Sequence, residues 1–354
     1  MLKDAKVFIC DDWNMDDNMA EITEGLLAQG VTVIRGPKTE RGVKLIYKEA
    51  DYPLFEDADV LMFSSRSVCD RNVIDAAKKA KALVFPTIGA DTTDVPYARE
   101  KGLILGNGAI PQNALSVAEA NIMHMLMAMH KPLKSLEITA GKTKKPSMRD
   151  MWSEIIFGKT VGMIGMGRIA KLIAERLHAL GVNIVSYDPY LPPDKFPEYV
   201  ARCETLEEML PQADIVGLYV VVNETTTNII NKRTLSMMKP SAHLINTSRG
   251  QTVNEEDLYE ALKNGVISGA TLDVTAVEPF PMDSKLRELD NVLVYPHVAG
   301  YTRSNYLGIT PAAIENIMSV LNGQPPKYCM FPADIAAWKN RFSAEYAERG
   351  VTME

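Results

Sequence analysis

Three side chains that suit the chemistry of a carbonyl group follow short apolar runs in the second half of the sequence. Arg249 comes after "HLIN", Glu278 after "GATLDV", and His297 directly after "NVLVYP". Such runs are typical of buried strands in a parallel sheet, and ligands bind at the edge where the carboxyl ends of these strands meet. A carboxylate beside an imidazole favours the protonated ring, and an arginine binds anionic groups. The three residues therefore suit the binding of a carboxylate next to a carbonyl; the alternative for Arg249 is a surface arginine in a turn.

A glycine-rich turn follows an earlier apolar run, in "TVGMIGMGRIAKLIAERL". Gly165, Gly167 and Ala170 match the pattern G-x-G-x-x-G/A between a predicted strand and a predicted helix. The first glycine permits the tight turn, the second lets a pyrophosphate approach the backbone, and the helix N-terminus offers free N–H groups. The next predicted strand ends at Asp188, 23 residues after Gly165. A carboxylate there would bind the adenosine ribose and repel the extra phosphate of NADP, so the segment predicts an NAD(H) site.

Strand-like and helix-like segments alternate in two stretches of the chain. In the first third, apolar runs such as "KVFIC" and "DVLMFS" are separated by amphipathic segments such as "NMAEITEGLLAQG"; the second stretch extends from Lys159 to about residue 302. This alternation predicts an α/β protein with parallel sheets covered by helices. Ser116 and Glu119 form a capping-box pattern that predicts the start of a buried apolar helix. The proline-containing segment "QPPKYCMFPADIAAW" after Gly323 is expected to be less regular and to pack on the first domain.

Composition limits the class of protein and of partner. With 354 residues, two domains are expected, and 46% hydrophobic and 23% charged residues are typical of a globular protein. A net charge of -7 argues against a nucleic-acid partner. No signal-peptide core or membrane-length apolar run is visible, and the four cysteines lack metal-type spacing. We expect a soluble cytoplasmic protein without a metal site.

Together these motifs make the sequence similar to the D-isomer-specific 2-hydroxyacid dehydrogenase family. The stretches "GKTVGMIGMGRIA", "INTSRGQTVNEEDL", "LDVTAVEP" and "PHVAGYT" occur in the family's order, with "SVAE" before them. The resemblance implies two Rossmann-like or flavodoxin-like parallel-sheet domains with a cleft between them. A substrate-binding domain of about 1–112 plus 303–354 would surround an NAD-binding domain of about 113–302. Members are usually dimers joined through their nucleotide domains, which implies a homodimer here.

The resemblance also implies a reaction and a role for single residues. The chain would interconvert a D-2-hydroxy acid and its 2-oxo acid with NAD(H). Arg249 would bind the substrate carboxylate, His297 would be the acid/base, and Glu278 would pair with His297. Residues expected to bind the cofactor are Gly165, Gly167, Arg168, Ile169, Asp188, Val220, Val221, Thr226, Thr247, Ser248, Arg249, Asp273 and His297. In addition to Arg249, the residues expected to contact the substrate are Ser65, Arg66, Ile88 and Gly89.

The departures from the family lie in loops that choose the substrate. Many relatives carry an arginine where Ser64 stands, and an asparagine is common at the position of Thr92. If Arg66 faces the substrate, it would favour a second anionic or hydroxylated group; the alternative is a surface arginine. The identity of the 2-oxo acid therefore stays open.

Three other activities are compatible with parts of this pattern. A formate dehydrogenase would place an amide beside the histidine, so Glu278 counts against it. A long-type phosphoglycerate dehydrogenase would carry a further domain, for which the roughly thirty residues after Gly323 are too few, whereas the short type stays open. The alternative from another class is an NADH-sensing interaction protein similar to the C-terminal-binding corepressors, whose disordered flanking segments have no counterpart here.

Overall fold

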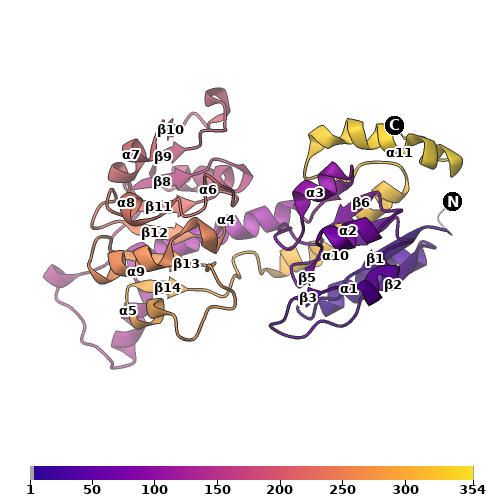
Figure 1. The fold of residues 1–354 in the computed structure, drawn as a ribbon. Coiled ribbons are helices and arrows are strands. Elements are labelled where there is room, and N and C mark those ends of the chain that lie inside the picture. Colours follow the sequence, from indigo (N-terminus) through magenta and orange to yellow (C-terminus); the bar gives the residue numbers. More distant parts are fainter. Residues whose placement is uncertain (1–3, 354) are drawn as a thin grey trace. The chain divides into compact units, whose positions relative to one another are not determined.

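The computed structural model describes residues 4–353 and divides into two compact units. Unit 1 contains the chain up to Asn113 together with the segment from Arg303 onward, and unit 2 is Ala114–Thr302. Each unit is built on a parallel β-sheet flanked by helices (Figure 1). The predicted α/β class with two parallel-sheet domains is therefore confirmed.

Unit 1 is built on a five-stranded sheet of order β2-β1-β4-β6-β7. Strand β1 has hydrophobic residues on both faces: Val7 and Ile9 pack with the core under α1, α10 and α11, whereas Phe8 packs on the opposite side. Continuous apolar runs of this kind are expected for strands buried on both faces. The strands are Lys6–Ile9, Thr32–Arg35, Val60–Met62, Ala82–Val84 and Ile104–Gly106 for β1, β2, β4, β6 and β7, with a separate pair Leu45–Ile46 (β3) and Ser67–Val68 (β5). The helices are Asp16–Ala28 (α1), Arg71–Ala76 (α2), Val95–Glu100 (α3), Arg303–Leu321 (α10) and Ile335–Glu348 (α11).

The C-terminal segment is more regular than the sequence suggested. Helix α11 buries Trp338, Phe342 and Tyr346, which are spaced four residues apart and so share one helix face. The buried Lys81 holds this helix to the sheet, because its Nζ lies 2.9 Å from Asp59 and 2.6 Å from Glu345 of α11. The expected less regular stretch is present at residues 324–334, which contain no α-helix or β-strand, but helix α11 begins at Ile335. The segment also packs on unit 1, as expected.

Unit 2 is built on a seven-stranded parallel sheet of order β10-β9-β8-β11-β12-β13-β14. Strand β8 lies between β9 and β11, so the turn after β8 is flanked by the loops that follow these two strands. The strands in chain order are Thr160–Ile164 (β8), Asn183–Tyr187 (β9), Val200–Arg202 (β10), Ile215–Leu218 (β11), His243–Asn246 (β12), Gly269–Leu272 (β13) and Val292–Val294 (β14). The helices are Pro111–His130 (α4), Pro132–Thr139 (α5), Arg168–Ala179 (α6), Leu206–Met209 (α7), Lys232–Leu235 (α8) and Glu255–Lys263 (α9).

Helix α4 begins five residues earlier than the capping-box pattern predicted. Its first residue is Pro111, and proline is favoured in a first helical turn because its missing N–H would have no helical partner there. Ser116 lies inside the helix, with its hydroxyl 2.6 Å from the Thr302 hydroxyl. The predicted helix start at Ser116 was therefore wrong, whereas the prediction of a buried apolar helix holds at Ala118 and Met125.

Three observations concern the described chain, residues 4–353, as a whole. None of its helices has the length and apolarity needed to cross a bilayer. Within it, no group of three or more His, Cys, Asp or Glu side chains is arranged to hold a metal ion. All four cysteines are unpaired, and three of them are buried.

Candidate active site

The glycine turn after β8 has the shape that a dinucleotide requires. Gly165 has a φ of +92°, and a Cβ at this position would lie 2.7 Å from the Tyr219 carbonyl oxygen, so only glycine fits. Gly167 precedes α6, and a Cβ there would meet nothing within 4 Å, which leaves space beside the helix N-terminus. Arg168 and Ile169 form the first turn of α6. The turn therefore offers both the space and the N–H groups that a pyrophosphate needs.

Asp188 is held at the end of β9 by backbone N–H groups. One carboxylate oxygen accepts from the Met166 amide at 2.9 Å, and the other accepts from Tyr190 and Leu191 at 3.0 and 3.2 Å. Each carboxylate oxygen has two lone pairs, so Asp188 can still accept from ribose hydroxyls. The Met166 bond ties the acid to the glycine turn, and the residues of this region fit NAD(H).

The loop after β11 contains the next three predicted cofactor residues. Val221 is 75% exposed, whereas Thr226 is buried. The Thr226 hydroxyl donates to the Val221 carbonyl at 2.6 Å and also lies near Asn223. Val220 packs partly against the core. The buried Thr226 therefore stabilises the conformation of this loop, and the exposed Val221 side chain provides an apolar surface for a ligand.

Arg249 follows β12, and a buried asparagine fixes its backbone. The Nδ2 of Asn246 donates to the Arg249 carbonyl at 2.9 Å, while its Oδ1 accepts from the Ser248 amide at 3.0 Å. Gly250 lies against Thr275, whose carbonyl carbon would be 1.9 Å from a Cβ at this position. Thr247, in the same turn, bonds through its hydroxyl to Asn121 of α4. Sequence reasoning missed Asn246 and Gly250, although an amide that ends a buried strand was a visible signal.

Glu278 and His297 form the pair that their positions predicted. The Nδ1 of His297 lies 3.0 Å from a carboxylate oxygen of Glu278, and the side chains are 47% and 40% exposed. Burial would raise the pKa of Glu278, but the hydrogen bond and charge of His297 outweigh it, with help from the Thr275 amide and Arg249, so this pKa is lowered. With Nδ1 bonded to a carboxylate, the other ring nitrogen is left to carry a proton toward a ligand.

A buried carboxylate sets the conformation of the histidine turn. His297 has a φ of +57°, in the left-handed region that side chains rarely adopt. Asp273 is 1% exposed, and its two oxygens accept from the amides of Val298 at 2.8 Å and Ala299 at 3.0 Å. Its main-chain carbonyl accepts from the His297 amide at 2.8 Å. Asp273 therefore fastens the turn that presents the imidazole, a role that sequence reasoning missed.

The predicted substrate residues of unit 1 follow β4 and β6. A guanidinium nitrogen of Arg66 bonds to the Ser65 hydroxyl at 3.3 Å, and its Nε lies 4.0 Å from the buried Asp12. The Arg66 guanidinium also lies 5.3 Å from the centre of the Trp13 ring. The Ile88 carbonyl accepts from Asn107 at 3.0 Å, and Gly89 is half-buried beside it. Arg66 is thus held against the end of its own sheet.

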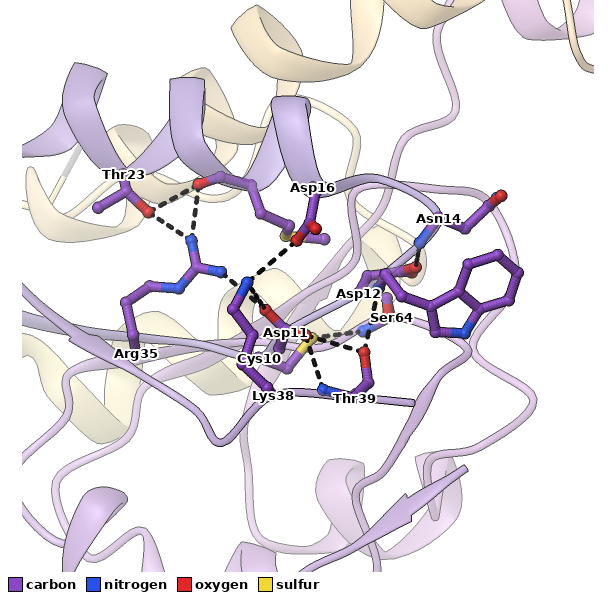
Figure 2. A network of polar contacts seen from close by, with 12 residues as sticks. Cys10, Asp11, Asp12, Asn14, Asp16, Thr23, Arg35, Lys38, Thr39 and Ser64 are labelled. Carbon is purple, nitrogen blue, oxygen red and sulfur yellow. Dashed lines mark hydrogen bonds and ion pairs between the residues drawn. The ribbon is translucent and has the colours of Figure 1, made fainter. Parts of the chain in front are cut away.

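A second buried carboxylate of unit 1, Asp11, organises the loop after β2 (Figure 2). It accepts from the amide and hydroxyl of Thr39 at 2.7 and 2.9 Å. Lys38 and Arg35 lie 3.0 and 3.4 Å from its other oxygen. Burial would raise the pKa of Asp11, but these hydrogen bonds and the Lys38 charge lower it. Sequence reasoning missed this network, whose members lie up to 28 residues apart.

The sequence matches the model of one protein family over half of its length. The sequence model described as "D-isomer specific 2-hydroxyacid dehydrogenase, NAD binding domain" matches residues 122–299, which contain the glycine turn, Arg249, Glu278 and His297. A hydroxypyruvate reductase of Thermotoga maritima is 35% identical over 76% of this chain and 86% of its own length.

Several relatives are longer than this chain. A D-3-phosphoglycerate dehydrogenase of Methanocaldococcus jannaschii is 35% identical over 78% of this chain but only 52% of its own length, so the chain spans about half of that protein. Among solved structures, a protein of Thermus thermophilus is 27% identical with a TM-score of 0.76, covering 92% of this chain and 99% of that chain.

Proposed function

Because the chain belongs to the D-isomer-specific 2-hydroxyacid dehydrogenase family and contains its NAD-binding domain, we propose that it interconverts a D-2-hydroxy acid and its 2-oxo acid with NAD(H). The observation that supports this most is the Glu278–His297 pair at 3.0 Å in the NAD-binding unit. Arg249 supports it further, since it follows β12 of the same sheet and its charge helps to lower the pKa of Glu278.

In the proposed reduction, three side chains have separate roles. Bound NADH supplies the hydride that reduces C2 of the 2-oxo acid. The Arg249 guanidinium binds the substrate carboxylate in a bidentate pair and stabilises the charge that develops on the C2 oxygen. Protonated His297 donates its Nε2 proton to that oxygen, while its Nδ1–H stays bonded to Glu278. In the oxidative direction the neutral imidazole takes the hydroxyl proton back.

We propose NAD rather than NADP as the cofactor because of Asp188. The Tyr190 and Leu191 amides hold its carboxylate, so it cannot turn away from an incoming 2′-phosphate without losing these bonds. Asp188→Ser should therefore lower the preference for NAD over NADP by about tenfold or more, measured as the ratio of kcat/KM values. An unchanged ratio would show that another residue sets the preference.

The substrate is proposed to be selected by residues of unit 1, namely Ser65, Arg66, Ile88 and Gly89. Arg66 is the one cation among them, and contacts with Asp12 and Trp13 restrict its side chain. This arrangement favours a 2-oxo acid that carries a further anionic or hydroxylated group. Phosphohydroxypyruvate, the substrate of a short-type phosphoglycerate dehydrogenase, is one such acid.

We also propose a cytoplasmic homodimer joined through unit 2. Large apolar side chains are exposed on α4, on α5 and in the segment that follows, namely Met123, Leu136, Met148, Ile155 and Phe157. Several large apolar side chains exposed within one region of the chain suit a protein interface. The four unpaired cysteines suit a reducing compartment. Sedimentation at several protein concentrations tests the dimer.

The function is tested by following NADH oxidation with a panel of 2-oxo acids. The panel contains glyoxylate, pyruvate, hydroxypyruvate, phosphohydroxypyruvate and 2-oxoglutarate, and Arg249→Ala is the control. Turnover that Arg249→Ala abolishes, with NADH binding near normal, is expected. Tight NADH binding without turnover of any 2-oxo acid would contradict the proposal and favour an NADH-sensing role.

A further inference from the structure

Two exposed hydroxyl groups form a bridge over the end of the nucleotide-binding sheet. Tyr190 follows Asp188 after β9, and Thr225 lies in the loop after β11, so the two come from strands on either side of β8. The Tyr190 Oη lies 3.0 Å from the Thr225 Oγ1. Both residues belong to unit 2, and neither was singled out by the sequence motifs.

The direction of this hydrogen bond follows from its neighbours. The Oδ1 of Asn223 accepts from the amides of Thr225 at 2.8 Å and Thr226 at 3.0 Å, which identifies it as the oxygen of the side-chain amide. The Thr225 hydroxyl lies 2.8 Å from the same oxygen, which can only accept, so Thr225 donates to Asn223. The Thr225 hydroxyl proton is then donated to Asn223, so Tyr190 donates in the hydrogen bond between the two hydroxyl groups and Thr225 accepts. In the chain Tyr190→Thr225→Asn223, each hydroxyl group therefore donates to the next residue.

The Tyr190→Thr225→Asn223 chain of hydrogen bonds fixes an aromatic ring that lies outside the hydrophobic core. Tyr190 is 70% exposed, and Val221 in the facing loop is 75% exposed. A hydrogen bond between two exposed hydroxyl groups contributes little to stability, since water can replace either partner. An exposed ring that is nevertheless held at both its backbone and its hydroxyl suits a binding surface.

The geometry of a dinucleotide indicates what this surface binds. In the proposed mode of binding, the phosphates would lie at the turn of Gly165 and Gly167 and the ribose hydroxyls at Asp188. The adenine and the phosphates are attached to opposite ends of the ribose. Tyr190 lies in the same turn as Asp188, and its hydroxyl reaches the loop after β11. We propose that Tyr190 is an adenine-stacking residue and that the Tyr190→Thr225→Asn223 chain positions its ring; this rests on the proposed use of NAD(H).

The experiment separates the adenosine half of the cofactor from the nicotinamide half. ADP-ribose contains the adenine but no nicotinamide, and its Kd is measured by competition with NADH fluorescence. Reduced nicotinamide mononucleotide lacks the adenosine, and its kcat/KM is measured with the best 2-oxo acid of the panel. Thermal unfolding followed by circular dichroism shows whether each variant is folded.

Four variants and one matched control are compared. Tyr190→Ala should weaken ADP-ribose binding about tenfold or more, because stacking of a base on an aromatic ring is lost. Tyr190→Phe and Thr225→Val, which break the chain but keep the ring, should weaken it about two- to threefold. Thr225→Ser should restore wild-type binding. The control is Thr227→Val in the same loop, since the Thr227 hydroxyl bonds only to the Asn223 carbonyl among residues 4–353.

The outcomes distinguish this proposal from the proposed activity. All five variants should use reduced nicotinamide mononucleotide as well as the wild-type protein does. Unchanged or tighter ADP-ribose binding by Tyr190→Ala would overturn the proposal and would show that the bridge covers the adenine site instead. Absence of 2-oxo acid turnover in the wild-type protein would contradict the proposed function but leave the ADP-ribose comparison intact.

Discussion

The two units use buried polar side chains at their strand ends in different ways. In unit 2, Asp273 and Asn246 are fully buried and bond to backbone amides and carbonyls of the turns that follow. In unit 1, Asp11 and Asp12 are equally buried, but cationic side chains lie against both of them. Both arrangements satisfy the requirement that a buried charge be paired or hydrogen-bonded.

The difference determines which charges remain available to a ligand. In unit 2, backbone groups satisfy the buried residues, and the ionisable pair Glu278–His297 is about half exposed. In unit 1, Lys38 and Arg35 are paired with Asp11. Substitutions at the strand ends of unit 2 should therefore mainly change the reaction rate, and substitutions of the Asp11 network should mainly change stability.

The largest effect is expected for His297→Gln. Removal of a general acid should lower kcat by about 10²- to 10⁴-fold, while the free energy of unfolding changes by less than about 0.5 kcal/mol because the side chain is half exposed. Steady-state kinetics and urea unfolding measure the two quantities. His178→Gln is the control, since His178 lies on helix α6 and its ring stacks on Tyr199, away from the strand ends. A variant that keeps more than a tenth of wild-type kcat would remove His297 from the reaction.

Asp273→Asn should have the next largest effect on rate. The new amide group would face one of the two N–H groups that Asp273 now accepts, so one hydrogen bond of the histidine turn is lost. A buried donor left without its acceptor costs about 1–3 kcal/mol. We expect kcat to fall by roughly 10- to 100-fold as the imidazole loses its position.

ADP-ribose binding by Asp273→Asn should stay near normal, because Asp188 and the glycine turn are unchanged. A crystal structure of the variant should show a shifted residue 297. A fall in stability without a fall in kcat would contradict the expectation that substitutions at the strand ends of unit 2 mainly change the reaction rate.

Asp11→Asn should show the opposite behaviour. The substitution leaves Lys38 and Arg35 without their buried partner and should lower the free energy of unfolding by about 1–2 kcal/mol at pH 7, with kcat changed less than twofold. The pKa of Asp11 is lowered in the folded protein, so its ionised form stabilises the fold above the unfolded-state pKa of about 4. As the pH falls through the folded-state pKa, this stabilisation is lost.

The wild-type protein and Asp11→Asn should therefore converge in stability below about pH 4. Urea unfolding at several pH values measures this. Lys48→Met serves as the control because Lys48 is exposed and outside the network. A constant difference at every pH would mean that the shape of Asp11, and not its charge, matters.

Local patterns predicted much of the candidate site. The glycine turn, Asp188 and the three residues after strands all depend on the sequence within a few positions of themselves. The role of Asp273 as the acceptor of the Val298 and Ala299 amides could not be predicted in this way, because those residues lie 25 and 26 positions away. Such a contact depends on which strands are neighbours, and the order of β12, β13 and β14 is a property of the folded sheet.

The departures from the predicted helices have different physical causes. At α4, Ser116 and Glu119 match a capping box, but Pro111 already starts the helix and the chain continues through these residues. At α11, the prolines of the segment indicated a less regular stretch, which is present up to Asp334, whereas the spacing of Trp338, Phe342 and Tyr346 was a helix signal that the prolines obscured. These three side chains pack in the core of unit 1, and such packing supplies most of the stability of a helix.

Glu278→Gln is expected to produce the smallest effect and tests how the unit 2 pair works. The two side chains lie 3.0 Å apart, and the hydrogen bond and charge of His297 lower the pKa of Glu278. Glutamine at 278 keeps an oxygen that can accept from the Nδ1–H of His297 but carries no charge. We therefore expect kcat to fall by about tenfold or less, as measured by steady-state kinetics. Glu278→Ala removes both the acceptor and the charge and should lower kcat further. If Glu278→Gln keeps the kcat of the wild-type protein while Glu278→Ala does not, Glu278 orients the imidazole through the hydrogen bond alone, and the exposed pair of unit 2 would then act by geometry and not by charge.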